Sequence, residues 1–111
     1  MSYKLKRISS DIIQEINKIL EEEIEDEMIK NVSITDLTID NDMTFATVYF
    51  MTRHKDTNLV EKKLNKASSF IRYNLAHKLN LRNTPFLKFV YDKSIENGEN
   101  IERILKSIDE K

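Results

Sequence analysis

The stretch from Leu64 to Asp92 constrains the fold of this chain more than any other part of the sequence. It begins as an amphipathic helix, which the small residues Ala67-Ser68-Ser69 interrupt before the helical pattern resumes and continues to Leu79. Pro85 cannot continue a helix, and it pushes the preceding residue towards extended geometry. Residues 86–92 are rich in aromatic and aliphatic side chains, which favour a strand. The stretch therefore predicts a broken helix followed by a strand.

The rest of the chain predicts one helix and two strands before this stretch, and one helix after it. Apolar residues recur at helical spacing over residues 3–24, whereas residues 31–40 and 45–53 have the composition of two strands of an antiparallel hairpin. The hydrophobic parity changes near Thr35-Asp36, which predicts a β-bulge. Asn58 and Glu61 resemble a capping box at the start of the broken helix. After a turn at Asn97-Gly98, residues 101–108 predict a short helix.

These elements predict an α+β fold with the order helix, strand, strand, broken helix, strand, helix. Three strands with helices on one face form a two-layer domain. The long helical return between the second and third strands favours a βαβ-like crossover, which is the KH-like (type II KH) arrangement. A length of 111 residues suits a single domain, so we expect one domain over residues 1–111.

The composition argues against most catalytic chemistry. The chain has no cysteine, and its single glycine, Gly98, excludes a glycine-rich phosphate loop. The two histidines, His54 and His77, are far apart and lack the spacing of metal ligands. We therefore expect no catalytic residue, no metal and no cofactor. No apolar run approaches a membrane span and no signal peptide is evident, so we expect a cytoplasmic protein with no membrane contact. We also expect a monomer.

The near-neutral net charge conceals a strong segregation of charge along the sequence. Residues 53–93 contain ten Lys or Arg and three Asp or Glu, whereas residues 21–52 contain one and nine. Such a chain can bind phosphate on one face and repel it elsewhere. We expect the acidic run at residues 21–27 to be a solvated helix end that repels RNA.

The basic segment coincides with the helix break, and this coincidence predicts an RNA-binding surface. Backbone N–H groups around Ser68 and Ser69 could receive a phosphate. Two assignments stay open: Tyr73 stacks on a base or is a surface tyrosine, and Arg82 binds phosphate or caps the carbonyls that end the helix. Phe86, Phe89 and Tyr91 are expected to pack in the core or on a sheet face. The predicted RNA-binding residues are Lys4, Lys6, Arg7, Arg53, Lys55, Lys62, Lys63, Lys66, Ala67, Ser68, Ser69, Arg72, Tyr73 and Arg82.

Several motifs resemble the ribosome-binding factor A family, in the family's order and over most of the chain. The family's Leu-x-Lys-Ala-x-Gly-x-Ile-Arg appears at residues 64–72, with Ser69 in place of the glycine. Its Leu-Arg-x-x-Pro-x-Leu-x-Phe appears at residues 81–89, and Ala46-Thr47-Val48-Tyr49 resembles its Ala-x-Val-Tyr. The family's long basic C-terminal tail has no counterpart here.

The resemblance implies a non-catalytic, bacterial maturation factor of the small (30S) ribosomal subunit. Such a factor binds immature 30S particles and 16S rRNA near the decoding region and the 5′ end. It supports late assembly and rRNA 5′-end processing, with importance in the cold. The partners implied are ribosomal proteins and a releasing GTPase.

Two other readings of the same residues remain open. The charged face could dock an acidic protein partner without RNA. The chain could also be a generic KH-type binder of single-stranded RNA, although it lacks the Gly-x-x-Gly loop that normally clamps the strand.

Overall fold

The computed structural model describes residues 3–94, and it contains the predicted helices and strands of this region together with one additional short helix. The predicted C-terminal helix and the turn before it lie outside the described residues. The additional helix, α2, follows the acidic run. The elements in chain order are α1 (Tyr3–Glu23), α2 (Glu27–Lys30), β1 (Ser33–Ile39), β2 (Phe45–Met51), α3 (Thr57–Lys66), α4 (Ser68–Lys78) and β3 (Phe86–Tyr91).

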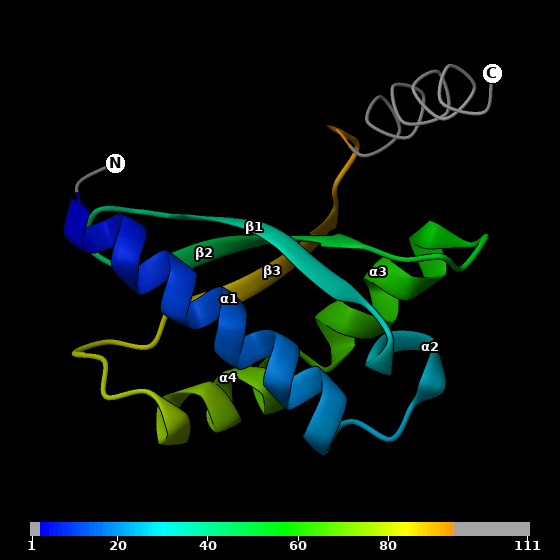
Figure 1. Cartoon of the computed structure of the whole chain (residues 1–111), viewed down its shortest axis with the longest axis horizontal. Coiled ribbons are helices and arrows are strands. Elements are labelled where there is room, and N and C mark those ends of the chain that lie inside the picture. The colour runs from blue at the N-terminus through cyan, green and yellow to red at the C-terminus, as the bar shows by residue number, and fades with distance from the viewer. Residues whose placement is uncertain (1–2, 95–111) are drawn as a thin grey trace, which may run out of the picture.

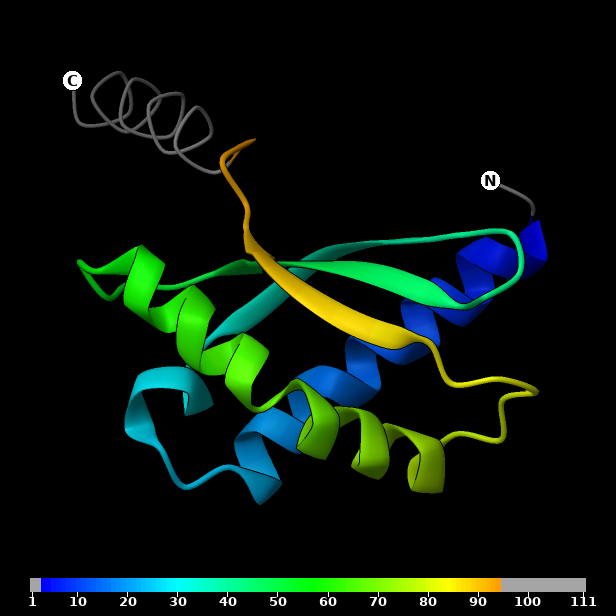
Figure 2. The same cartoon turned by 180° about the vertical axis from the view of Figure 1, so that it is seen from behind.

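The three strands form one mixed sheet with β2 in the centre. β1 pairs with β2 in antiparallel register, and β3 pairs with the other edge of β2 in parallel register. α1 packs against β1 and α4, while α3 and α4 pack against β3. The four helices of residues 3–94 lie on one side of the sheet (Figure 1, and from behind in Figure 2). This confirms the predicted two-layer α+β architecture, and no element of residues 3–94 covers the opposite face of the sheet.

The core lies between the sheet and the helices. Val48 and Phe50 point into it from the central strand β2, Phe89 points into it from β3, and all three are fully buried. The predicted apolar stripe of the broken helix is buried on both sides of the break, through Val60, Leu64, Ile71 and Leu75. Burial of each large apolar side chain contributes about 1.5–3 kcal/mol. Because the stripe is buried on both sides of the break, the apolar face continues from α3 into α4.

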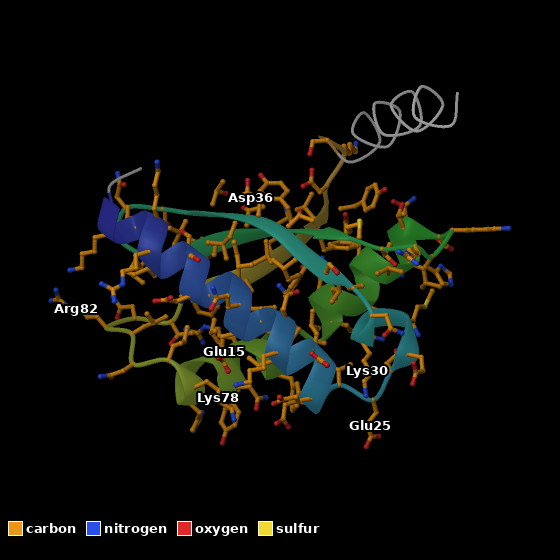
Figure 3. The ribbon with its side chains drawn as sticks, in the orientation of Figure 1. Glu15, Glu25, Lys30, Asp36, Lys78 and Arg82 are labelled. Atoms are coloured by element: carbon orange, nitrogen blue, oxygen red, sulfur yellow. The ribbon has the colours of Figure 1, made fainter. Side chains whose placement is uncertain are left out.

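The predicted bulge is present in β1, between Ile34 and Asp36. The hydroxyl of Thr35 in the bulge donates to Oδ2 of Asp92 at 2.7 Å, just beyond the end of β3. The same hydroxyl oxygen lies 3.3 Å from the backbone oxygen of Tyr49. The bulge thus ties β1 to the far edge strand across β2. In Figure 3, the adjoining Asp36 lies on the open side of the sheet.

The start of α3 differs from the prediction. The capping box at Asn58 and Glu61 is wrong, because the side chain of Asp56 accepts the N–H of Leu59 at 3.0 Å and the helix begins at Thr57. Asp56 has the non-helical backbone of an N-cap residue, and aspartate is among the best residues at that position.

Glu61 instead acts on β3, the edge strand, together with Asn65. The Asn65 side chain accepts the N–H of Phe89 at 2.8 Å and donates to its backbone oxygen at 2.9 Å, while Glu61 accepts the N–H of Tyr91. α3 therefore takes the place of a fourth strand for these backbone groups, which fixes the helix break relative to the sheet.

Candidate nucleic-acid interface

The helix break falls at Ala67, the first residue of the predicted interruption Ala67-Ser68-Ser69, and the two serines already belong to α4. Ala67 has φ −90° and ψ 1°, and its N–H donates to the backbone oxygens of Lys63 and Leu64, both at 3.1 Å. No side chain caps the start of α4. Within residues 3–94, Met43 in the β1–β2 turn is the one non-glycine residue with positive φ. Ser69 therefore does not occupy a conformation that requires glycine.

Apart from Arg72, which lies in α4, the predicted basic residues fall into two groups towards opposite ends of the molecule. The start of α1 lies at one end, next to the β1–β2 turn and the α4–β3 loop, where Figure 3 places Arg82. The end of β2 and the start of α3 lie at the other end (Figure 1). The helix break lies between them. The first group is Lys4, Lys6, Arg7 and Arg82; the second is Arg53, Lys55, Lys62, Lys63 and Lys66.

Acidic residues border the second group. Lys63 forms an ion pair with Asp26, with a distance of 3.1 Å between Nζ and Oδ2. Lys63 and Lys66 line one depression together with Glu23, Glu25 and other residues of the acidic segment. Hydrogen bonds from the N–H of Met28 and from Lys63 hold the pKa of Asp26 below its usual value. The acidic run at residues 21–27 therefore adjoins the helix break. It neutralises part of the positive charge that we predicted to bind phosphate.

The side chain of Arg72 forms hydrogen bonds with the protein's own backbone. Its Nε donates to the backbone oxygens of Thr84 and Pro85 at 3.1 and 3.2 Å, and its Nη2 donates to Thr84 at 2.9 Å. The guanidinium carbon lies 4.1 Å from the centre of the Phe86 ring, which is a cation–π geometry. The side chain is half-buried. Arg72 therefore holds the α4–β3 loop against α4, a role that the sequence did not reveal.

Three adjoining depressions connect the helix break with the first basic group. Ser68, Ser69 and Arg72 line the depression at the break, and Arg72 continues into a second one with Asn83. Asn83 continues into a third, of about 970 Å³, at the start of α1. The charged lining of the third is mixed, with Lys4, Arg7 and Arg82 beside Asp11 and Asp42. A polar path thus runs from the break along the α4–β3 loop.

The structure excludes one of the two roles considered for Arg82, and it does not decide between the two roles considered for Tyr73. Arg82 is exposed, and its side chain makes no hydrogen bond to any described residue, so it does not cap the carbonyls that end α4. Tyr73 is 64% exposed on α4, and its ring centre lies 4.3 Å from that of His77. Base stacking by Tyr73 stays a prediction.

The two histidines have local partners. Nδ1 of His54 accepts the N–H of Asp56 at 3.0 Å, and Nδ1 of His77 lies 2.8 Å from the backbone oxygen of Tyr73. Across residues 3–94, no group of three or more His, Cys, Asp or Glu side chains is arranged to hold a metal ion. In the same range, no helix combines the length and the apolar character that crossing a membrane requires.

An exposed aromatic pair on the open face of the sheet was missed as a functional candidate. Phe45 and Phe86 are neighbours in the β2–β3 register, with ring centres 5.7 Å apart, and are 61% and 52% exposed. Phe89 is buried and Tyr91 half-buried, as expected. The sequence did carry a signal, because Phe86 has the opposite strand parity to Phe89 and therefore faces the other way.

The fold and the position of the helix break define a KH-like domain of type II. The family model for ribosome-binding factor A matches residues 4–105. The chain therefore belongs to the ribosome-binding factor A family. The ribosome-binding factor A of Ruthia magnifica is 36% identical over 107 residues, which are 96% of this chain and 96% of that protein.

Solved structures support the fold. The crystal structure of ribosome-binding factor A from Thermus thermophilus matches with a TM-score of 0.70 at 15% identity, over 78% of this chain and 93% of that chain. A homology model of the Thermus thermophilus protein, fitted into a cryo-EM map of its complex with the 30S subunit, matches with a TM-score of 0.62 at 15% identity, over 77% and 91% of the two chains.

Proposed function

We propose that this protein binds the immature small ribosomal subunit and contacts 16S rRNA as a non-catalytic maturation factor. The observation that carries the proposal is membership of the ribosome-binding factor A family over residues 4–105. The complex of the Thermus thermophilus relative with the 30S subunit supports the same partner for this chain. The finer role is late assembly and rRNA 5′-end processing near the decoding region, with a demand that increases in the cold.

The polar path between the helix break and the start of α1 is the best-supported contact surface. Arg82, Lys4 and Arg7 are exposed there, and their side chains make no ion pair with a described residue. Lys63, by contrast, is paired with Asp26. Contacts of this kind position a protein on phosphates without reading sequence. Specificity then comes from the shape of the rRNA and from neighbouring ribosomal proteins.

The same proposal covers the location, the oligomeric state and the release of the protein. The chain acts as one cytoplasmic domain over residues 1–111 and as a monomer without a cofactor, and a GTPase assists its release from the particle. The predicted set of RNA-binding residues is kept, with one change of role. Arg72 acts by holding the α4–β3 loop rather than by meeting phosphate directly.

Sucrose-gradient co-sedimentation with purified immature 30S particles tests the proposal. Wild-type protein is expected to travel with the particle, and binding should weaken as the salt concentration increases, since phosphate contacts release counterions. The Lys4/Arg7/Arg82→Ala variant is expected to leave the particle at a lower salt concentration than wild type. Arg72 is not part of this variant, because its loss would disturb the loop and confuse folding with binding.

Two further variants make the comparison specific. Lys62/Lys66→Ala tests the basic group beside the acidic segment, and Lys18/Lys30→Ala is the matched control with the same change in charge outside the predicted set. Wild-type protein that stays at the top of the gradient at every salt concentration refutes the ribosome proposal and favours an acidic protein partner. Binding to free single-stranded RNA but not to particles would favour a generic KH-type binder.

A further inference from the structure

The exposed face of the sheet carries an aromatic pair that the packing of the domain does not require. Val48, Phe50, Leu87 and Phe89 point towards the helices and are buried, whereas Phe45 and Phe86 have the opposite strand parity and are both more than half exposed. Transfer of aromatic surface out of water is favourable, so an exposed pair of this size marks a binding surface.

The surroundings of the pair are cationic. The guanidinium of Arg72 lies over the Phe86 ring, 4.1 Å from its centre. Lys88 follows two residues later on the same face of β3 and is exposed. The two carboxylates nearest along the chain, Asp40 and Asp42, are turned to the backbone of the β1–β2 turn. Oδ1 of Asp40 accepts the N–H groups of Thr44 at 2.7 Å and Phe45 at 3.1 Å, and Oδ1 of Asp42 accepts the N–H of Thr44 at 3.2 Å.

The pair also adjoins the polar path at the helix break. Phe86 lines the same depression as Ser68, Ser69 and Arg72. It lines the next depression as well, together with Thr84 and Asn83 of the α4–β3 loop. A strand of RNA whose phosphates follow this path would therefore pass within reach of the two rings.

We propose that Phe45 and Phe86 form a stacking platform for an unpaired nucleotide of ribosomal RNA. Aromatic side chains on an open sheet face bind bases by stacking, because every base has a π-face. Arg72 already covers part of Phe86, so Phe45 presents the more accessible ring. This inference rests on the proposed function, and it adds a base contact on the sheet to the phosphate contacts beside the helix break.

The test compares two fluorescein-labelled probes at low salt: a single-stranded oligoadenylate of ten nucleotides, and a ten-unit abasic strand with the same phosphates. Wild-type protein is expected to bind the oligoadenylate about 10-fold more tightly, since stacking strengthens binding at each base. The Phe45→Leu/Phe86→Leu variant is expected to lose this preference and to retain its affinity for the abasic strand. Phe45→Tyr/Phe86→Tyr should keep the preference.

Phe70→Leu is the matched control, because Phe70 is 46% exposed on α4 and lines neither of the two depressions that Phe86 lines. It should keep the wild-type preference, and the circular dichroism of every variant should match that of wild type. Wild-type protein without a preference for bases overturns the inference, as does an equal loss in Phe70→Leu. An equal loss on both probes would mean displaced phosphate contacts, and it also overturns stacking.

The result of this binding test can be distinguished from the result of the co-sedimentation test of the proposed function. Wild-type protein that travels with 30S particles but shows no preference for bases leaves the ribosome proposal intact and removes only the platform. A double variant that loses affinity for particles, with the oligoadenylate preference unchanged, would assign the pair to a ribosomal protein and overturn the RNA platform.

Discussion

Replacement of Arg72 by methionine is expected to destabilise the protein strongly, although arginine on a basic helix usually suggests a surface residue. The change removes three hydrogen bonds to the backbone oxygens of Thr84 and Pro85 and the cation–π contact with Phe86. Methionine keeps an unbranched apolar stem, so the loss reports mainly on the guanidinium.

The size of the effect follows from these contacts. A hydrogen bond from a charged donor contributes about 1.5–3 kcal/mol, and an exposed cation–π contact about 0.5–1 kcal/mol. Two of the three bonds share the Thr84 oxygen and the side chain is only half-buried, so the contributions are not additive. We expect a decrease of about 2–3 kcal/mol in the free energy of unfolding, which is about 10 °C or more in Tm for a domain of this size.

Urea denaturation measures this difference, with Arg82→Met as the control. Arg82 is exposed and its side chain makes no hydrogen bond to a described residue, so its replacement should change the free energy of unfolding by less than about 0.5 kcal/mol. Arg72→Lys should fall between the two, because a single ammonium group cannot reproduce the fork of donors. A value for Arg72→Met within about 0.5 kcal/mol of wild type would refute the loop-holding role and return Arg72 to the phosphate contacts.

Three further predictions concern stability, each measured by urea denaturation. Asn65→Leu leaves the β3 backbone N–H and C=O that Asn65 pairs without partners, which should cost about 2–4 kcal/mol; a loss below about 0.5 kcal/mol would contradict this edge role. Ser69→Gly should lower stability by up to about 1 kcal/mol, because Ser69 has no positive φ for glycine to relieve; an increase would reveal strain. Hydrogen bonds from Ser94 and Thr35 hold the pKa of Asp92 below its ordinary 3.8. The ionised carboxylate therefore stabilises the folded protein at pH values above the unfolded-state pKa. This stabilisation is lost as the pH falls through the lowered pKa of the folded state. Asp92→Asn should flatten the loss of stability below pH 3.8, and an unchanged acid profile would count against these bonds.

Much of the candidate site could be located from the sequence, but not its chemistry. The helix break and the basic residues beside it were located from the sequence pattern, and in the structure Lys62, Lys66 and Ser69 are exposed next to the break at Ala67. The partners of Arg72 could not be foreseen, because they lie 12 and 13 residues further along the chain and depend on how the loop returns to β3.

Within residues 3–94, the sequence by itself determined α1, α3 and α4, the three strands, the bulge and the buried stripe of α3 and α4. These depend on periodicity and on local backbone preferences, which are properties of neighbouring residues. The tertiary structure alone decided that Asp26 meets Lys63 across 37 residues. It also decided that the basic residues separate into two groups, and that Phe45 and Phe86 meet on an open face. The physical reason is that the sequence pattern shows which face of a helix or strand is apolar, whereas tertiary packing determines which other element lies against that face.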